Sequence, residues 1–434
     1  VSCQTTQGGS NAETTQAVSY SGDLSSLLRA ASVEVQKWDK GNERERDVTV
    51  YSFNYDNPEI KDRLIQAVKD AGFYQVWTGE YSRDWDLPRG VLRWCIPADT
   101  EKEDRQIQVS AVGETTVHTY FFKPIPDSGV YWTAVEDSPF SSGSDDEISD
   151  IAYGGGTFVA VGIYKEGSNW KGEMAYSADG VTWTKVTDTK FGSATAIVYG
   201  NGKFVASGVD GKVAYSADGV TWTTGDSTFS GTIAYGGGKF IVGGGYHDGR
   251  RWHCGMSYSG DGVTWTAVKD SAFGSGGDIS AIAYGGGRFV AGGNEDGTRS
   301  WVPAMAYSND GVTWTKVKYI YSTPSSGIRG IAYGDGKFVA VGGKGQMAYS
   351  ADGITWTAVT DSTLDEYLGT IVYVGGRFVA VSYNGKTAYS ADGVTWTAGE
   401  DINLGSAVEA LSYGGGRFVV VGWESKIAYS NVQE

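Results

Sequence analysis

The eleven-residue string Met174–Thr184, which reads Met-Ala-Tyr-Ser-Ala-Asp-Gly-Val-Thr-Trp-Thr, constrains the fold of this chain more than any other stretch. Close copies recur at intervals of about 40 to 50 residues and end at Trp222, Trp265, Trp314, Trp356 and Trp396. Each copy has two arms of alternating apolar and polar residues around an Asp-Gly pair, which predicts a β-hairpin. Because one hairpin cannot bury its apolar face alone, regular copies imply an array whose neighbours cover one another.

A second repeated string, Ile151–Gly162, supplies two further strands to each repeat. Its tyrosine, Tyr153, recurs at Tyr199, Tyr235, Tyr284, Tyr333, Tyr373 and Tyr413. Four antiparallel strands per repeat form one blade of a β-propeller. We therefore predict a mainly β fold.

The two ends of the repeat region predict how the ring closes. The last repeat runs through Ile427 and lacks a Trp strand, whereas Gly129–Val135 matches Gly180–Val186 and has no hairpin partner before it. The first and last segments thus complete one blade together, in a Velcro-type closure that removes both open sheet edges. This arrangement predicts seven blades.

Ahead of the repeats, the sequence predicts a flexible tether over residues 1–20 and a small α/β domain over 21–126, with the propeller over 127–434. Apolar residues from Leu24 to Trp38 follow a helical period, and Gly41 ends it. A strand follows at 48–53, and Asp56 with Pro58 begins a second helix. Further strands are predicted at 73–78, 90–96, 105–112 and 115–123. This helix-strand-helix opening resembles the periplasmic α/β domains of bacterial outer-membrane lipoproteins.

The formal charge of −16 argues against a protein that grips nucleic acid or an anionic membrane by bulk electrostatics. No apolar run approaches the ~20 residues that span a bilayer. We therefore expect no nucleic-acid partner, and membrane contact only through a lipid anchor.

Three cysteines, Cys3, Cys95 and Cys254, make neither a zinc ribbon nor a disulfide framework. The opening Val1-Ser-Cys-Gln with its polar tract resembles the processing region of bacterial lipoproteins, which implies a lipidated Cys3. A free thiol and a Cys3–Cys95 disulfide remain open alternatives. We expect an extracytoplasmic location, at the cell surface or in the periplasm.

The segment Tyr176–Trp183 resembles the Asp-box of sialidases (BNR-type repeats), Vps10-type receptors and bacterial surface proteins. The usual pattern is Ser-x-Asp-x-Gly-x-Thr-Trp, whereas Asp179 and Gly180 are adjacent here. The resemblance implies a propeller and says little about activity. The residues themselves favour structural turns, in which the carboxylates accept backbone N–H bonds and the glycines supply positive φ, over the alternative of a repeated ligand site. These aspartates are Asp179, Asp218, Asp261, Asp310, Asp352 and Asp392.

Function on a propeller is expected where the repeats differ. Three repeats extend the connection between the second and third strands, and each extension carries a Trp four residues before a Met or its equivalent. These residues are Trp170, Trp252 and Trp301, and beside them lie Arg250, Arg251, His253 and Arg299. Such a rim suits sugar stacking or a protein hot spot. The alternative is that each Trp packs its own hairpin against the neighbouring blade.

Catalysis has little support in the sequence. Sialidase-like chemistry needs an arginine cluster, but Arg329 is the one arginine at the position four residues before the inner-strand tyrosine. Glu409 holds the same position in the last repeat and is able to pair with Arg329. A two-carboxylate glycosidase built on Asp150 and Glu409 is the enzymatic alternative. We expect no cofactor and no metal, although Asp145–Glu147 with Asp150 offers oxygens of the kind that Ca²⁺ prefers.

The leading hypothesis is a non-catalytic, secreted or surface-anchored binding protein whose propeller engages a protein or glycan. One alternative is a structural subunit of a surface layer, sheath or appendage that self-associates. The other is a glycoside hydrolase.

Overall fold

The computed structural model describes residues 36–43, 46–54, 73–82, 91–97, 107–112, 116–124 and 130–432, the last range with gaps at 188–191, 209–210, 248–251, 275–276, 297–300, 318–326 and 403. The chain divides into two compact units, residues 1–133 with 431–434 and residues 134–430. The tether over 1–20, with Cys3, lies outside the described residues, as do most of the first predicted helix and all of the second.

The first unit contains a six-stranded antiparallel sheet in the order β1-β2-β4-β5-β6-β3. Its strands are β1 (Gln36–Glu43), β2 (Arg46–Asn54), β3 (Phe73–Ser82), β4 (Val91–Pro97), β5 (Ile107–Val112) and β6 (Thr116–Pro124). The strands predicted from 48 onward are confirmed. The helix predicted to run through Trp38 is wrong at its end, because residues 36–38 pair with 50–52 of β2.

Residues 130–432 form seven four-stranded antiparallel sheets, which confirms the predicted propeller. Blade 1 contains β8 (Glu147–Gly154), β9 (Thr157–Glu166), β10 (Asn169–Ser177) and β11 (Thr184–Lys185). Blade 2 contains β12 (Ala194–Gly200), β13 (Lys203–Gly208), β14 (Lys212–Ser216) and β15 (Thr223–Asp226). Blade 3 contains β16 (Thr232–Gly236), β17 (Lys239–His247), β18 (Trp252–Ser259) and β19 (Thr266–Ala267).

The remaining blades repeat this order. Blade 4 contains β20 (Asp278–Gly285), β21 (Arg288–Asp296), β22 (Trp301–Ser308) and β23 (Thr315–Lys316). Blade 5 contains β24 (Ile328–Gly334), β25 (Lys337–Gly342), the 3₁₀ turn η3 (Gly343–Gly345), β26 (Met347–Ser350) and β27 (Thr357–Ala358). Blade 6 contains β28 (Leu368–Val374), β29 (Arg377–Ser382), β30 (Thr387–Ser390) and β31 (Thr397–Ala398). Blade 7 contains β32 (Val408–Gly414), β33 (Arg417–Gly422), β34 (Ile427–Val432) and β7 (Val130–Ala134).

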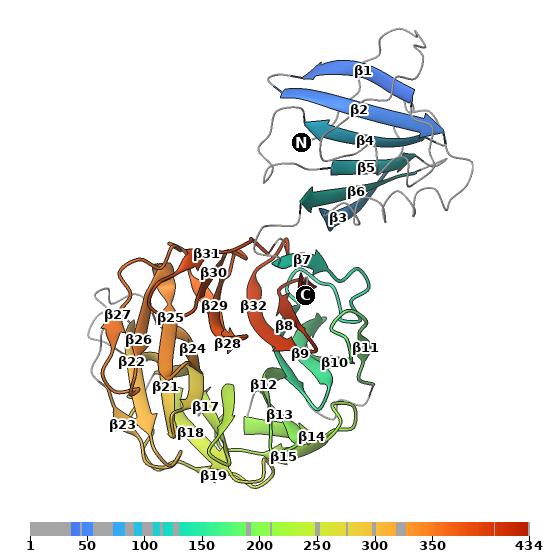
Figure 1. Cartoon of the computed structure of the whole chain (residues 1–434). Coiled ribbons are helices and arrows are strands. Elements are labelled where there is room, and N and C mark those ends of the chain that lie inside the picture. Colours follow the sequence, from blue (N-terminus) through green and yellow to red (C-terminus); the bar gives the residue numbers. More distant parts are fainter. Residues whose placement is uncertain are drawn as a thin grey trace. The chain divides into compact units, whose positions relative to one another are not determined.

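Blade 7 confirms the predicted closure, since its sheet runs in the order β32-β33-β34-β7 and so joins the two ends of the repeat region. The backbone N–H of Val135 continues this pairing by donating to the Ile427 carbonyl over 2.8 Å. The first strand of each blade is innermost and contacts the first strands of both neighbours, so the sheets form a closed ring (Figure 1).

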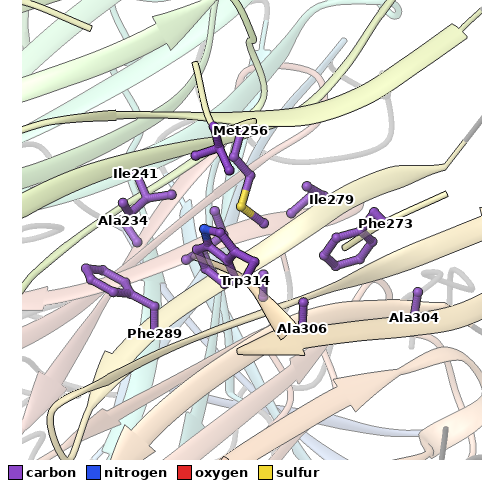
Figure 2. Close-up of a cluster of buried hydrophobic side chains, with 12 residues drawn as sticks. Ala234, Ile241, Met256, Phe273, Ile279, Phe289, Ala304, Ala306 and Trp314 are labelled. Carbon is purple, nitrogen blue, oxygen red and sulfur yellow. The ribbon is translucent and has the colours of Figure 1, made fainter. Parts of the chain in front are cut away.

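The hydrophobic core lies between blades rather than within each blade. The cluster in Figure 2 joins Ile241 and Met256 of blade 3 to Phe289 and Trp314 of blade 4. Trp222 packs in the same way with blade 1, Trp356 with blade 4 and Trp396 with blade 5. The repeated Trp rings therefore bury large apolar surfaces between adjacent sheets.

A glycine at the end of the inner strand interlocks each blade with the next. A Cβ on Gly285 of blade 4 would lie 1.9 Å from Cγ of Tyr333 in blade 5, so the tyrosine ring occupies the space that a side chain would need. Equivalent pairs are Gly154–Tyr199, Gly200–Tyr235, Gly236–Tyr284, Gly334–Tyr373 and Gly414–Tyr153. Each of these tyrosines also packs on the phenylalanine that follows it across its own hairpin, with ring centroids 4.6–4.8 Å apart.

The junction between blades 6 and 7 departs from this rule. Val374 stands where the other blades have glycine, and Tyr413, the tyrosine that would pack there, is 38% exposed. A valine side chain fills the space that the tyrosine ring uses elsewhere. Junction 6–7 therefore lacks the interlocking contact.

We predict that Gly285→Ala destabilises the propeller by about 1–3 kcal/mol, the usual cost of overpacking a well-filled site. The added methyl group collides with the Tyr333 ring, and denaturant unfolding measures the loss. Val374→Ala is the matched control, because that position already carries a side chain. Equal stability of Gly285→Ala and the native protein would contradict the interlocking role of the glycine.

Candidate functional site

The six repeated aspartates are engaged within their own turns. In the turn of blade 3, Oδ1 of Asp261 accepts the N–H groups of Val263 and Thr264, both over 2.8 Å. The Ser259 hydroxyl donates to the same oxygen and accepts the N–H of Gly262, whose φ is 74°. The same bonds recur in the other five turns, at Asp179, Asp218, Asp310, Asp352 and Asp392. The structural assignment of these residues agrees with this geometry.

These hydrogen bonds stabilise the charged carboxylate. The N–H groups of Thr264 and Val263 lower the pKa of Asp261 from 3.8 to about 2. A depressed pKa in the folded state contributes stability above the unfolded value, and this contribution is lost as pH falls from about 4 to about 2.

We predict that Asp261→Ala lowers the free energy of unfolding at pH 7 by about 1 kcal/mol, the typical worth of a side chain that caps backbone N–H groups. The difference between variant and native protein should shrink as the pH falls from 4 to 2. Thermal unfolding at several pH values measures this difference in stability. Asp401→Ala, which removes an exposed ion pair with Lys386, is the control and should have little effect. A pH-independent difference would refute the charge-based account.

The predicted Trp rim maps onto three long hairpins between second and third strands. Trp170 lies opposite Lys165 in the β9–β10 hairpin, 48% exposed, with the Lys165 ammonium 5.6 Å from its ring centroid. Its exposure does not fit the alternative in which the ring packs against the neighbouring blade. Trp252 and His253 lie in β18 opposite His247 and Tyr246, and Trp301 lies in β22 opposite Asp296. The side chains of Trp252, His253 and Trp301 lie outside the described part, and so do Arg250, Arg251 and Arg299.

A β-bulge near the start of the inner strand creates a second kind of special position. In blade 7, Val408 pairs with Gly422 and Ala410 with Val421, so Glu409 between them has no partner on the next strand. Equivalent bulges hold Ser149, Thr195, Ser280, Arg329 and Gly369. A bulge redirects the side chain of its extra residue. The sequence-predicted residues Arg329 and Glu409 thus occupy equivalent bulges in blades 5 and 7.

Two aromatic residues at equivalent loop positions lie beside these bulges. Tyr383 and Trp423 each come directly after the second strand of their blade. Tyr383 donates its N–H to the Tyr367 carbonyl over 3.0 Å and accepts from Val408 over 2.9 Å, which ties blade 6 to blade 7. Trp423 donates its N–H to Ala407 over 3.0 Å and forms a β-bridge with Glu147 of blade 1. The backbones of Tyr383 and Trp423 are therefore each held by hydrogen bonds or bridges to segments of two successive blades.

Glu409 bonds to Trp423 and interacts electrostatically with Glu147, Arg329 and Tyr383. The Trp423 indole N–H donates to Oε1 of Glu409 over 2.6 Å, and the Tyr383 ring lies beside Gly369. Burial raises the pKa of Glu409 to about 7, against the lowering effect of the indole bond; Glu147 raises it further and Arg329 lowers it. Burial also raises the pKa of Tyr383, with Glu409 and Glu147 adding to the effect. We call Glu147, Arg329, Tyr383, Glu409 and Trp423 the inner-rim cluster.

Two expectations about these charges need correction. Arg329 affects Glu409 by its charge, but no ion pair joins these two described residues. Asp150 is not free to act with Glu409, because its Oδ1 accepts the N–H of Ile151 and its Oδ2 accepts the N–H of Ile197 in blade 2, both over 2.8 Å. Burial raises the pKa of Asp150 to about 7 in spite of these bonds.

The acidic loop offers no cation site in the described structure. Asp145 forms an ion pair with Lys165 at 2.9 Å, and Asp146 accepts the backbone N–H groups of Gly143 and Lys165. Within the described ranges, no group of three or more His, Cys, Asp or Glu residues is arranged to hold a metal ion. Cys254 is half-buried, and burial raises the pKa of its thiol to about 12. None of the helices in the described part is long and apolar enough to cross a membrane.

Sequence reasoning missed Tyr383, Trp423 and the role of Glu147. An internal alignment of the repeats holds a signal for the first two. Five residues after the conserved phenylalanine, the blades with short connections carry Val209, Gly343, Tyr383 and Trp423. Aromatic residues thus occur at this position in two neighbouring blades.

The comparisons with known proteins concern the propeller. Virginiamycin B lyase from Staphylococcus aureus, in a catalytically inactive form with quinupristin, is 12% identical, with a TM-score of 0.54, over 70% of this chain and 100% of that one. YCF48 from Cyanidioschyzon merolae is 14% identical, with a TM-score of 0.48, over 69% of this chain and 98% of that one. A further structure, described as YCF48 bound to D1 peptide, is 14% identical with a TM-score of 0.49 over 70% and 95%.

At such low identity the lyase match shows the fold alone. No curated protein matches the sequence at a significant level. A family model described as the DUF6242 beta propeller domain matches residues 259–410, which lie within the seven-bladed ring.

Proposed function

We propose that this protein is a non-catalytic binding protein and that the inner-rim cluster is the centre of its binding surface. The observation that carries the proposal is the conjunction of exposed aromatic side chains with partly buried carboxylates where the repeats lose their regularity. Trp423 is 43% exposed, and Tyr367, whose carbonyl accepts the N–H of Tyr383, is 50% exposed. Large aromatic side chains with one polar end are characteristic of binding hot spots.

The backbone supports the same proposal. Tyr367, Tyr383 and Trp423 belong to segments joined by hydrogen bonds that run through blades 6 and 7, and the bridge to Glu147 continues them to blade 1. A surface held in place by such bonds loses little conformational entropy when a partner binds. Trp170 at its exposed hairpin extends the proposed surface on the side of blade 1. The proposal includes a protein or glycan partner outside the cytoplasm.

We predict that the double variant Trp423→Ala and Tyr367→Ala loses at least about tenfold in affinity for ligands that the native protein selects from a displayed peptide library and a glycan array. The matched control is Val220→Ala with Ile354→Ala, which alters two exposed apolar residues at the turns between third and fourth strands. Ligands that bind the double variant as tightly as the native protein would rule out the inner rim as the binding surface.

A glycoside hydrolase is the second candidate, because Glu409 combines a pKa of about 7 with a neighbouring carboxylate, Glu147. A carboxyl group with a raised pKa near a second carboxyl group is the arrangement of a general acid and its partner. In this version Glu147 replaces the Asp150 that the sequence suggested.

The binding proposal predicts no turnover of a panel of aryl glycosides above the level of the Glu409→Gln variant. The hydrolase proposal predicts turnover that this substitution reduces by a factor of about 10² or more, the usual contribution of a general acid. Circular dichroism verifies that the variant is folded. Turnover by the native protein that disappears in Glu409→Gln would replace the binding proposal with the catalytic one.

A further inference from the structure

The inner rim combines aromatic faces with an excess of negative charge. Two carboxylates, Glu147 and Glu409, share the cluster with one guanidinium, that of Arg329. The exposed indole of Trp423 is tethered to Glu409 by its N–H, so its ring is held in a fixed orientation beside a carboxylate. Aromatic faces next to carboxylates attract cations both through the ring quadrupole and through charge.

We propose that the inner rim recognises a cationic side chain, lysine or arginine, presented by a segment of a partner protein. This inference rests on the proposed binding function and names the chemistry of the partner. A neutral sugar would use the aromatic faces but would leave Glu147 and Glu409 without a counter-charge. An anionic partner would meet both carboxylates and the protein's net charge of −16.

The groups that face Glu409 come from several elements. Glu147 lies at the start of β8, Arg329 at the bulge of β24 and Tyr383 after β29, while Trp423 follows β33. The Glu366 carboxylate accepts the hydroxyl of Ser382, the residue before Tyr383, over 3.1 Å. Burial is the largest influence on the pKa of Glu409 and raises it, whereas the charge of Arg329 lowers it. The cluster holds one guanidinium and two carboxylates.

This arrangement couples cation binding to a proton. Glu409 ionises only as pH rises through about 7, and a bound cation favours the ionised form. Affinity for the cation should therefore increase from pH 6 to pH 8, and binding below pH 7 should release a proton. The Glu409→Gln variant cannot ionise and should bind weakly at every pH.

The test uses the full chain and a labelled peptide with a single lysine, acetyl-Gly-Ser-Lys-Ser-Gly-amide, in a fluorescence polarisation assay. The same peptide with Nε-acetyl-lysine keeps the length and removes the charge. We expect the acetylated peptide to bind at least about tenfold more weakly at pH 8. Glu147→Gln and Glu409→Gln should each weaken binding of the lysine peptide, and Glu409→Gln should abolish its pH dependence.

Asp365→Asn is the matched control, because Asp365 is an exposed acid next to Glu366 and outside the cluster. Equal binding of both peptides would overturn the proposal, and so would a loss in Asp365→Asn as large as that in Glu409→Gln. The protein could bind both peptides equally while the double variant Trp423→Ala and Tyr367→Ala still loses affinity for the selected ligands. In that case the binding function stands and the proposal of a cationic partner is wrong. If that double variant loses nothing, the binding function itself fails.

Discussion

The packing of a tyrosine ring onto a glycine of the preceding blade is the contact on which the ring depends. Each propeller sheet exposes two apolar faces, and neither is buried until a neighbour covers it. The missing side chain at Gly285 lets Tyr333 approach the adjacent inner strand, while Trp356 packs in the same junction between blades 4 and 5. Residues with no role in chemistry thereby fix the angle between blades. The ends of the inner strands, including the bulges, are positioned as a consequence.

The repeated residues made the propeller predictable from the sequence. Each blade needs the same turns and the same packing contacts, so the same residues recur at the same spacing. Gly129–Val135 matches the outer strand that the last repeat lacks, and so predicts how the ring closes. The hairpin aspartates were predictable for the same reason, because a tight turn needs a short acceptor and a glycine with positive φ. The prediction was wrong at residues 36–38, where the apolar pattern of the first helix overlaps a strand. Pairing with 50–52 of β2, far along the chain, decides that segment.

The inner rim was only partly predictable, because it is assembled from four blades. Arg329 and Glu409 stood out by their alignment with the inner-strand tyrosines. The importance of Glu147 comes from its bridge to Trp423, which joins the two ends of the repeat region and leaves no local pattern. Asp150 shows the converse. Its position suggested an active carboxylate, whereas its oxygens hold two backbone N–H groups and one of these belongs to the next blade.

Val374 makes one junction between blades different from the other six. Six junctions between blades are interlocked by glycine and tyrosine, and the one between blades 6 and 7 is not. Blade 7 therefore has the glycine–tyrosine contact on the side of blade 1 and lacks it on the side of blade 6. Blade 7 is also the blade that holds the two ends of the repeat region together. A seven-fold repeat thus contains a single built-in seam. Of the inner-rim residues, Tyr383 spans this seam, since its carbonyl accepts the N–H of Val408 in blade 7.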